Sequence, residues 1–155
     1  MFNVEISTNP DLEDARGKAV LADIKMMQIK GVKDVHFCPV YFFSGNLTFE
    51  QIQTISQRLL TDAVSENYSI AKTDKICADK FNVIEVYYKK GVTDALALSV
   101  KKAIKSFDLD DKIIVNTAKR YYLDGQVSFG ALENIALKIL ANSLIQEYRI
   151  EKKIL

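Results

Sequence analysis

The pattern of apolar and polar positions repeats itself along the chain. A shift of 80 residues aligns the two halves without a gap, and the matching positions are spread over the whole length. They include Glu5 with Glu85, Asp14 with Asp94, Val20 with Val100, Ile24 with Ile104, Tyr41 with Tyr121 and Tyr148 with Tyr68. Matches at one fixed period indicate two copies of one structural unit. We therefore predict a first unit over residues 1–75 and a second over residues 76–155, packed as one compact body.

The strand signals come in the same order in both units. Alternating residues predict a first strand from Asn3 to Thr8, echoed from Asn82 to Tyr88. A second strand runs from about Lys33 to Phe43, with Val35, Phe37, Tyr41 and Phe43 on one face; Val115, Thr117, Tyr121 and Leu123 are the counterparts. Pro39 cannot donate to a ladder, which predicts that this strand is bulged or at a sheet edge there. A short third strand closes each unit, at Tyr68–Ile70 and Tyr148–Ile150.

In each unit, the two sequence segments that connect these strands are predicted to be helices. Asp14 is the expected N-cap of the first helix, because its carboxylate can accept from backbone N–H groups of the first turn. Its buried face is expected to hold Val20, Ile24 and Met27, matched by Val100, Ile104 and Phe107, and Gly31 suits the helix end. The second helix is predicted to begin after Thr48, because Thr48 lies three residues before Gln51, which is the spacing of a capping box. Its buried face is expected to hold Ile52, Ile55 and Leu59. In the second unit Ser128 is the expected cap of the matching helix, and the buried face holds Leu132, Ile135 and Ile139.

The resulting fold class is α+β, with two strand–helix–strand–helix–strand units. About 75 residues give only a marginal core. We therefore expect the two units to pack as an internal pseudo-dimer with antiparallel sheets, each covering apolar surface of the other.

Composition and charge bear on the binding partners and the cellular location that we expect. The net charge of +1 gives no general attraction to nucleic acid or membranes. The apolar runs are far shorter than the roughly 20 residues that span a bilayer. The two cysteines, Cys38 and Cys77, form no CxxC pair. With no signal-peptide pattern at the first residues, a cytoplasmic location is expected.

The search for catalytic and metal-binding residues returns weak candidates. No glycine-rich phosphate loop is present. His36 and Cys38 leave one face of the predicted strand, so a Cys–His pair is conceivable, but packing or surface roles are favoured because no orienting acid or oxyanion loop is visible. The acidic residues Asp11, Glu13 and Asp14 lie at a predicted helix start, where negative charge is favourable against the helix dipole. A role in helix capping is therefore favoured over a metal site. The acidic run at Asp108, Asp110 and Asp111 lacks the glycine and distal glutamate of an EF-hand, which favours a solvated turn.

The Lys119-Arg120-Tyr121-Tyr122 segment places cations beside aromatic rings. Such a pattern can bind phosphates or RNA. It is equally typical of a strand with two different faces, and this second interpretation is favoured.

Two segments resemble a known family. Asp14-Ala15-Arg16-Gly17-Lys18-Ala19-Val20 resembles the Asp-Pro-x-Gly-x-Ala-Val segment of PurS, the small subunit of phosphoribosylformylglycinamidine synthase. The segment from Lys138 to Ile150 is similar to the closing Lys-Leu-Leu-Ala-Asn-x-x-Ile-Glu-x-Tyr segment of that family. The tandem resembles the N-terminal part of the fused enzyme. Ala15 replaces the usual proline, and Ala97 stands where the second unit would need the glycine that matches Gly17.

The resemblance implies a PurS-like, distantly ferredoxin-like pseudo-dimer that serves purine biosynthesis without catalytic or metal-binding residues of its own. It implies a structural subunit of an ATP- and glutamine-dependent ligase, which docks the synthetase and glutaminase parts so that ammonia passes between them. ATP and Mg would belong to the synthetase. A homo-oligomer is compatible with this role. The expected partner-binding residues are Asp14, Arg16, Lys18, Arg120, Tyr121, Tyr122 and Gly125. A free-standing ligand sensor or an RNA-binding module is the alternative.

Overall fold

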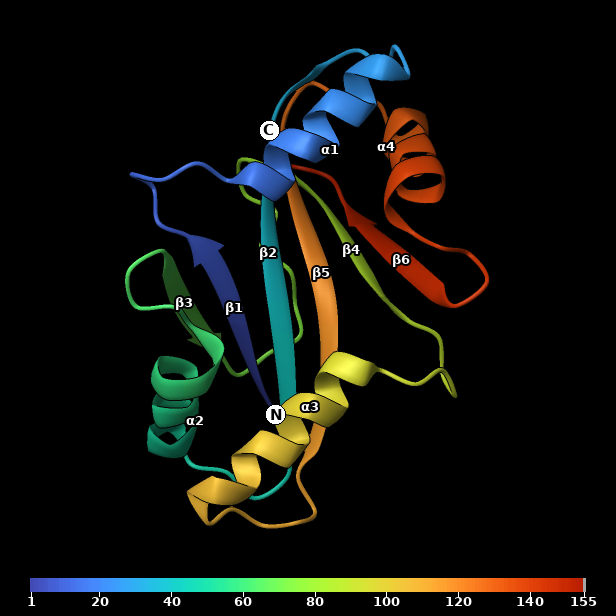
Figure 1. Cartoon of the computed structure of the whole chain (residues 1–155). Coiled ribbons are helices and arrows are strands. Elements are labelled where there is room, and N and C mark those ends of the chain that lie inside the picture. Colours follow the sequence, from blue (N-terminus) through green and yellow to red (C-terminus); the bar gives the residue numbers. More distant parts are fainter. Residues whose placement is uncertain (155) are drawn as a thin grey trace. The chain divides into compact units, whose positions relative to one another are not determined.

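The computed structural model describes residues 1–154, so Leu155, the last residue of the expected second unit, lies outside the described residues. In the first repeat the elements follow in the order β1 (Phe2–Thr8), α1 (Ala15–Met26), β2 (Val32–Ser44), α2 (Phe49–Ile55) and β3 (Glu66–Ala71) (Figure 1). In the second repeat they are β4 (Asn82–Tyr88), α3 (Ala95–Ala103), β5 (Ile114–Gly125), α4 (Phe129–Ile135) and β6 (Gln146–Glu151). The predicted order of elements is therefore confirmed in both repeats. A π-helical turn extends each second helix, at Ser56–Leu60 and Ala136–Leu140.

The strands form one sheet in the order β3-β1-β2-β5-β4-β6. Antiparallel pairing joins β1 to β2, from Phe2↔Phe43 to Glu5↔Val40, and joins each first strand to its third, as in Val4↔Ile70 and Ile84↔Ile150. The predicted α+β class is confirmed. The expectation of a sheet edge at Pro39 is wrong, because β2 lies inside the sheet. The last pair of the β1–β2 ladder is instead Glu5↔Val40. The next β2 residue in the direction of the ladder would be Pro39, which has no backbone N–H to donate.

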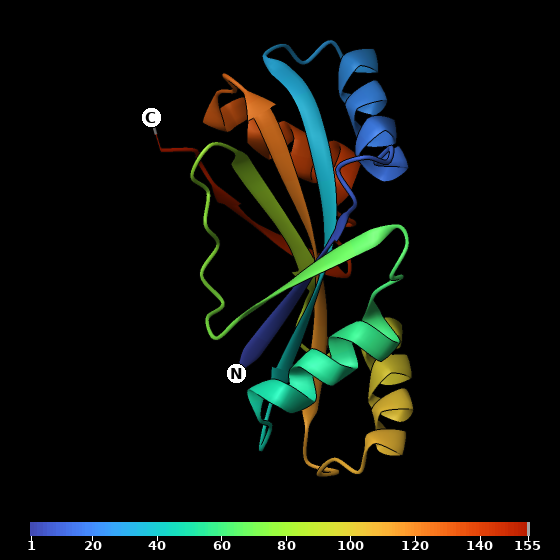
Figure 2. The same ribbon diagram turned by 90° about the vertical axis from the view of Figure 1, so that its left-hand side faces the viewer.

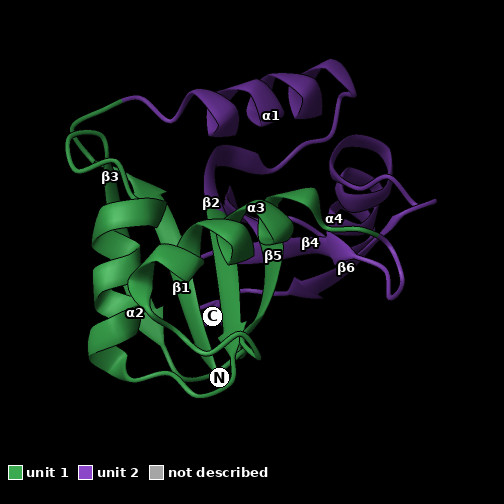
Figure 3. Ribbon diagram, turned by 60° about the horizontal axis from the view of Figure 1, so that its bottom comes forward, with its two compact units in different colours: residues 1–12, 39–75, 93–118 green, residues 13–38, 76–92, 119–155 purple. Residues whose placement is uncertain are grey.

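The compact units of the structure do not coincide with the sequence repeats. Unit 1 consists of residues 1–12, 39–75 and 93–118, and unit 2 consists of residues 13–38, 76–92 and 119–155 (Figure 3). Unit 1 therefore holds β1, α2 and β3 of the first repeat together with α3 of the second. Unit 2 holds β4, α4 and β6 of the second repeat together with α1 of the first. The first helix of each repeat is thus exchanged into the core of the other.

The core of unit 1 shows this exchange in its side chains. Ile52 and Ile55 from α2 belong to one buried cluster with Val100 and Ile104 from the α3 segment, packed over Val4 of β1. Figure 2 shows α2 and α3 side by side. The apolar stripes predicted for both helices are confirmed, but they come from different repeats.

The core of unit 2 is built in the same way, with a helix of the first repeat packed among elements of the second. Ile24 of α1 is buried with Leu132 and Ile135 of α4 over Ile84 and Val86 of β4. In each core, the helix of the other repeat therefore contributes to removing apolar surface from water.

The two long strands serve both cores. Val35 and Phe37 of β2 belong to the core of unit 2, whereas Phe43 and the partly buried Tyr41 belong to that of unit 1. In β5 the assignment is reversed, with Val115 in unit 1 and Tyr121 and Leu123 in unit 2. The predicted apolar face is confirmed in both strands, and its division between two cores explains their length.

The helix starts agree with the sequence, and one helix end does not. The Thr48–Gln51 capping box forms, with bonds of 3.2 and 2.9 Å, and Ser128 Oγ accepts from the N–H of Ala131. The expectations for Met27 and Gly31 are wrong. The helix ends at Met26, Met27 is 40% exposed, and Gln28 takes the left-handed conformation at φ 60° that Gly31 was expected to supply. Asp108, the repeat counterpart of Gln28, has φ 53°.

Candidate interaction surface

The start of α1 is tied to β2 by one carboxylate. Asp14 Oδ1 accepts from the N–H of Gly17, and its Oδ2 accepts from the N–H of Phe37, both at 2.8 Å. Asp94 repeats the arrangement toward Ala97 at 2.9 Å and Thr117 at 2.8 Å. Each aspartate therefore caps a helix and fixes that helix on a strand of its own repeat.

Gly17 lets α1 approach β2 closely. A Cβ atom at this position would lie 2.1 Å from the carbonyl oxygen of Val35. The second repeat holds Ala97 at the matching place, where the side chain is buried. The glycine of the Asp-x-x-Gly pattern is thus a packing requirement of unit 2.

Arg16 lies above an aromatic pair that joins the two repeats. Its guanidinium carbon is 4.6 Å from the centre of the Phe37 ring, and that ring lies 5.2 Å from the ring of Tyr121 on β5. A cation over an aromatic face is held by the ring quadrupole. Because Phe37 lies on β2 and Tyr121 on β5, this ring contact joins a strand of the first repeat to a strand of the second within unit 2.

Lys119 adds a second cation to this group. Burial and the neighbouring charge of Arg16 lower the pKa of the Lys119 ammonium below its usual 10.5. Burial raises the pKa of the Tyr121 phenol above 10.0, and Arg16 opposes that shift. Both groups therefore feel the Arg16 charge. We call Arg16, Phe37, Lys119 and Tyr121 the Arg16 cluster.

The Arg16 cluster has no charged counterpart in unit 1. The equivalent positions hold Leu96, Thr117, Pro39 and Tyr41. Leu96 is exposed on α3 where Arg16 is exposed on α1. The two repeats thus share one fold but present different chemistry at the same place.

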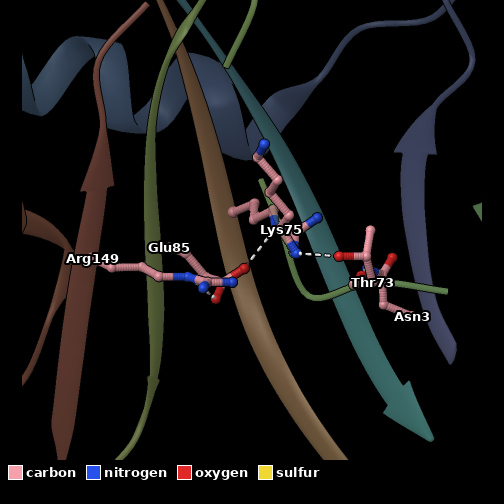
Figure 4. A network of polar contacts seen from close by, with 6 residues as sticks. Asn3, Thr73, Lys75, Glu85 and Arg149 are labelled. Atoms are coloured by element: carbon pink, nitrogen blue, oxygen red, sulfur yellow. Dashed lines mark hydrogen bonds and ion pairs between the residues drawn. The ribbon is translucent and has the colours of Figure 1, made fainter. Parts of the chain in front are cut away.

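Arg120 has an internal role. Its side chain is 5% exposed, and its Nε donates to Glu85 Oε2 at 2.5 Å. Arg149 Nε donates to the other oxygen of Glu85 at 2.9 Å, as Figure 4 shows for Glu85 and Arg149. One buried carboxylate therefore holds two guanidinium groups, and the first repeat has Val40 and Ser69 at the matching positions of the arginines. The surface available to a partner at Arg120 is small.

The remaining predicted residues are placed as follows. Lys18 is exposed and pairs with Glu13 at 3.0 Å. Tyr122 is half-buried, with its ring edge-on to Phe81 at 6.0 Å. Gly125 is buried where two main chains meet, because a Cβ there would lie 1.9 Å from the carbonyl oxygen of Gly31.

The structure brings part of the predicted site together. Arg16 and Tyr121, expected on separate segments, lie in one cluster, and Asp14 and Lys18 flank it on α1. Sequence reasoning missed Phe37 and Lys119 as members. The available signal was the strand period, since Lys119 and Tyr121 are two residues apart.

The candidate Cys–His pair and the acidic clusters have other surroundings. His36 is exposed, with its Nε2 at 3.5 Å from Asp34 and its ring edge-on to Phe81, whereas Cys38 is buried. Among residues 1–154, no three His, Cys, Asp or Glu side chains are placed to hold a metal ion. Within the same part of the chain, no helix has the length and apolarity needed to cross a membrane.

The comparisons add a family match over both repeats. The family model PurS, described as phosphoribosylformylglycinamidine (FGAM) synthase, matches residues 1–74 and 82–153. A search of the curated proteins found no match.

Proposed function

The chain belongs to the PurS family of FGAM synthase, and we propose that it is the non-catalytic assembly unit of that enzyme. In this role it holds a synthetase part and a glutaminase part in the cytoplasm, in the geometry that lets ammonia pass from one to the other. The observation that carries the proposal is the match of one family to both repeats. FGAM synthesis is a step of purine biosynthesis, so the chain serves that pathway.

The Arg16 cluster supports a docking role. Two cations, Arg16 and Lys119, are close enough for one to lower the pKa of the other. Like charges held together repel, and an acidic group of a partner would relieve that repulsion. Arg16 also presents a flat, exposed cation over an aromatic ring, and arginine is enriched among the side chains that contribute most to interfaces.

The difference between the two units supports two different partners. Unit 2 presents Arg16 and Lys18 at the start of α1, whereas unit 1 presents Leu96 and Leu98 at the start of α3. Leu96 and Leu98 are 49% and 58% exposed. A scaffold that must bind two unlike proteins needs two unlike surfaces, and the repeat supplies them on one fold.

The test is a reconstitution with the synthetase and glutaminase proteins of the same organism. FGAM formation is measured once with glutamine and once with ammonium as the nitrogen source. The proposal expects the chain to be required for the glutamine-dependent reaction and to matter far less with ammonium. Equal glutamine-dependent rates with and without the chain would contradict it. Mixing the chain with glutamine and ATP alone controls for intrinsic activity.

A further inference from the structure

An open pocket of about 340 Å³ lies in unit 2. It is formed where β4 ends and β6 begins, and its walls include Tyr87, Lys89, Leu137 and Tyr148. This pocket does not involve the Arg16 cluster. Its volume accommodates a large apolar side chain, and its two tyrosines provide rigid contact surface.

Exposed apolar side chains surround the pocket. Leu137 on the wall is 50% exposed, and Leu144 and Ile145 in the adjoining loop are 83% and 39% exposed. Grouped exposed apolar residues of this kind mark surfaces that another protein covers. In the first repeat the matching residues are Gln57, Val64 and Ser65, so two of the three positions are polar.

The pocket adjoins the free edge of the sheet. β6 is the last strand in the order β3-β1-β2-β5-β4-β6, and its first residues, Gln146, Glu147 and Tyr148, line the pocket. An edge strand carries backbone N–H and C=O groups on its outer side that can pair with an added strand. A free edge beside a side-chain pocket is the arrangement by which proteins bind extended peptides.

Charge indicates what the edge would bind. Lys89 and Lys90 follow β4 at the pocket, and Lys152 and Lys153 follow β6 at the opposite end of this antiparallel pair, against Glu147 and Glu151 on β6 itself. The matching lysine positions at the β3 edge are Asn9, Pro10, Lys72 and Thr73, of which one is a cation. The β6 edge is therefore the basic one of the two.

We propose that the β6 edge of unit 2 binds an extended acidic segment of a partner protein, which adds a strand to β6 and inserts a large apolar side chain into the Tyr87–Leu137–Tyr148 pocket. The partner is the synthetase or the glutaminase part, so this inference rests on the proposed function. Lys89 at the pocket wall pairs with a carboxylate of the segment. The β3 edge, where two of the three matching positions are polar, does not take part.

Two substitutions test the pocket without changing the fold. Lys89→Asn and Leu137→Gln introduce the residues that the first repeat carries at Asn9 and Gln57. We expect the double variant to bind the partner proteins at least about 10-fold more weakly, since well-packed interface contacts have effects of that size. The matched control is Val64→Gln beside the β3 edge, at a residue that is 82% exposed; it keeps full affinity for the partner of the β6 edge.

Hydrogen exchange of the full chain, alone and with the synthetase and glutaminase proteins, tests strand addition. Slower exchange over residues 146–151 in the complex, with no change over residues 66–71, supports the proposal. A complex of unchanged affinity for the double variant and without protection of β6 overturns it and leaves the assembly role intact. Protection of β6 that appears in the chain alone as its concentration rises assigns the edge to a second copy and also overturns it. Absence of any complex contradicts the assembly role itself.

Discussion

The carboxylate of Asp14 accepts a hydrogen bond from the backbone N–H of Phe37 at 2.8 Å, across 23 residues of sequence. This bond fixes the first turn of α1 against β2 at the point where Phe37 enters the core of unit 2. It therefore also sets where Arg16, two residues further along, meets the aromatic pair. Asp94 and Thr117 make the same connection in the second repeat.

The close contact of α1 with β2 predicts a cost for adding one methyl group. Gly17→Ala would place a Cβ atom 2.1 Å from the backbone oxygen of Val35, so α1 must shift. We expect the free energy of unfolding to fall by about 1–3 kcal/mol in urea titrations. Gly130→Ala in α4 is the matched control, because no atom beyond its chain neighbours and its own helix backbone lies within 4 Å of the added Cβ. That control should be neutral or more stable by up to about 1 kcal/mol. Equal stabilities of the two variants would contradict the packing argument.

The buried carboxylate of Glu85 predicts a large effect when it is removed. Glu85→Ala removes the carboxylate acceptor that the buried side chain of Arg120 uses at 2.5 Å. Removing one partner of a buried ion pair costs about 3–5 kcal/mol. Glu147→Ala, at the exposed residue that pairs with Tyr87 across β4 and β6, should change stability by less than about 0.5 kcal/mol. A loss below about 1 kcal/mol for Glu85→Ala would show that Arg120 does not depend on it.

Tyr121 predicts a specific sensitivity to alkaline pH. Burial raises the pKa of its phenol in the folded chain above the ordinary value of 10.0. The unfolded chain therefore loses this proton first, and the free energy of unfolding falls as the pH rises past about 10. Tyr121→Phe has no proton to lose, so its unfolding free energy should fall less steeply between pH 9 and about 11. Parallel curves for the two proteins would exclude Tyr121 as a cause.

A substitution of Arg16 is expected to weaken partner binding without changing the stability of the fold. Arg16→Ala removes an exposed side chain that covers Phe37 but leaves Asp14, Gly17 and the core unchanged, so thermal stability should stay within about 0.5 kcal/mol. Binding to the partner proteins at matched salt should weaken by about 10-fold or more, because arginine is enriched among the side chains that contribute most to interfaces. Lys102→Ala, an exposed cation on α3, serves as the control. If Arg16→Ala binds like the parent chain, Arg16 is a solvated surface residue.

The sequence was sufficient for the elements and their order but not for the exchange of helices. Val20 and Ile24 predict that α1 has a buried face, yet amphipathic spacing does not identify the surface against which that face packs. The alternating apolar residues of β2 likewise do not indicate that Val35 and Phe43 belong to different cores. That information depends on contacts between residues far apart in the sequence, such as Ile24 with Ile84 in unit 2.

The candidate site was predictable only in part for the same reason. Arg16 and Tyr121 are predicted on separate segments, and they come together because the Phe37 ring on β2 contacts both of them. Arg120 looked like a surface cation next to aromatic residues. Its burial follows from Glu85 on the neighbouring strand β4, a partner that the local pattern around Arg120 does not contain.

The central claim is that this chain physically joins a synthetase and a glutaminase. Sedimentation velocity of the three proteins, alone, in pairs and together in the presence of glutamine, ATP and Mg, tests it most directly. The account predicts one faster-sedimenting species that contains all three proteins and does not form when the chain is omitted. Sedimentation of the chain at its own rate in every mixture, or association of the other two proteins to the same extent without it, would contradict the account.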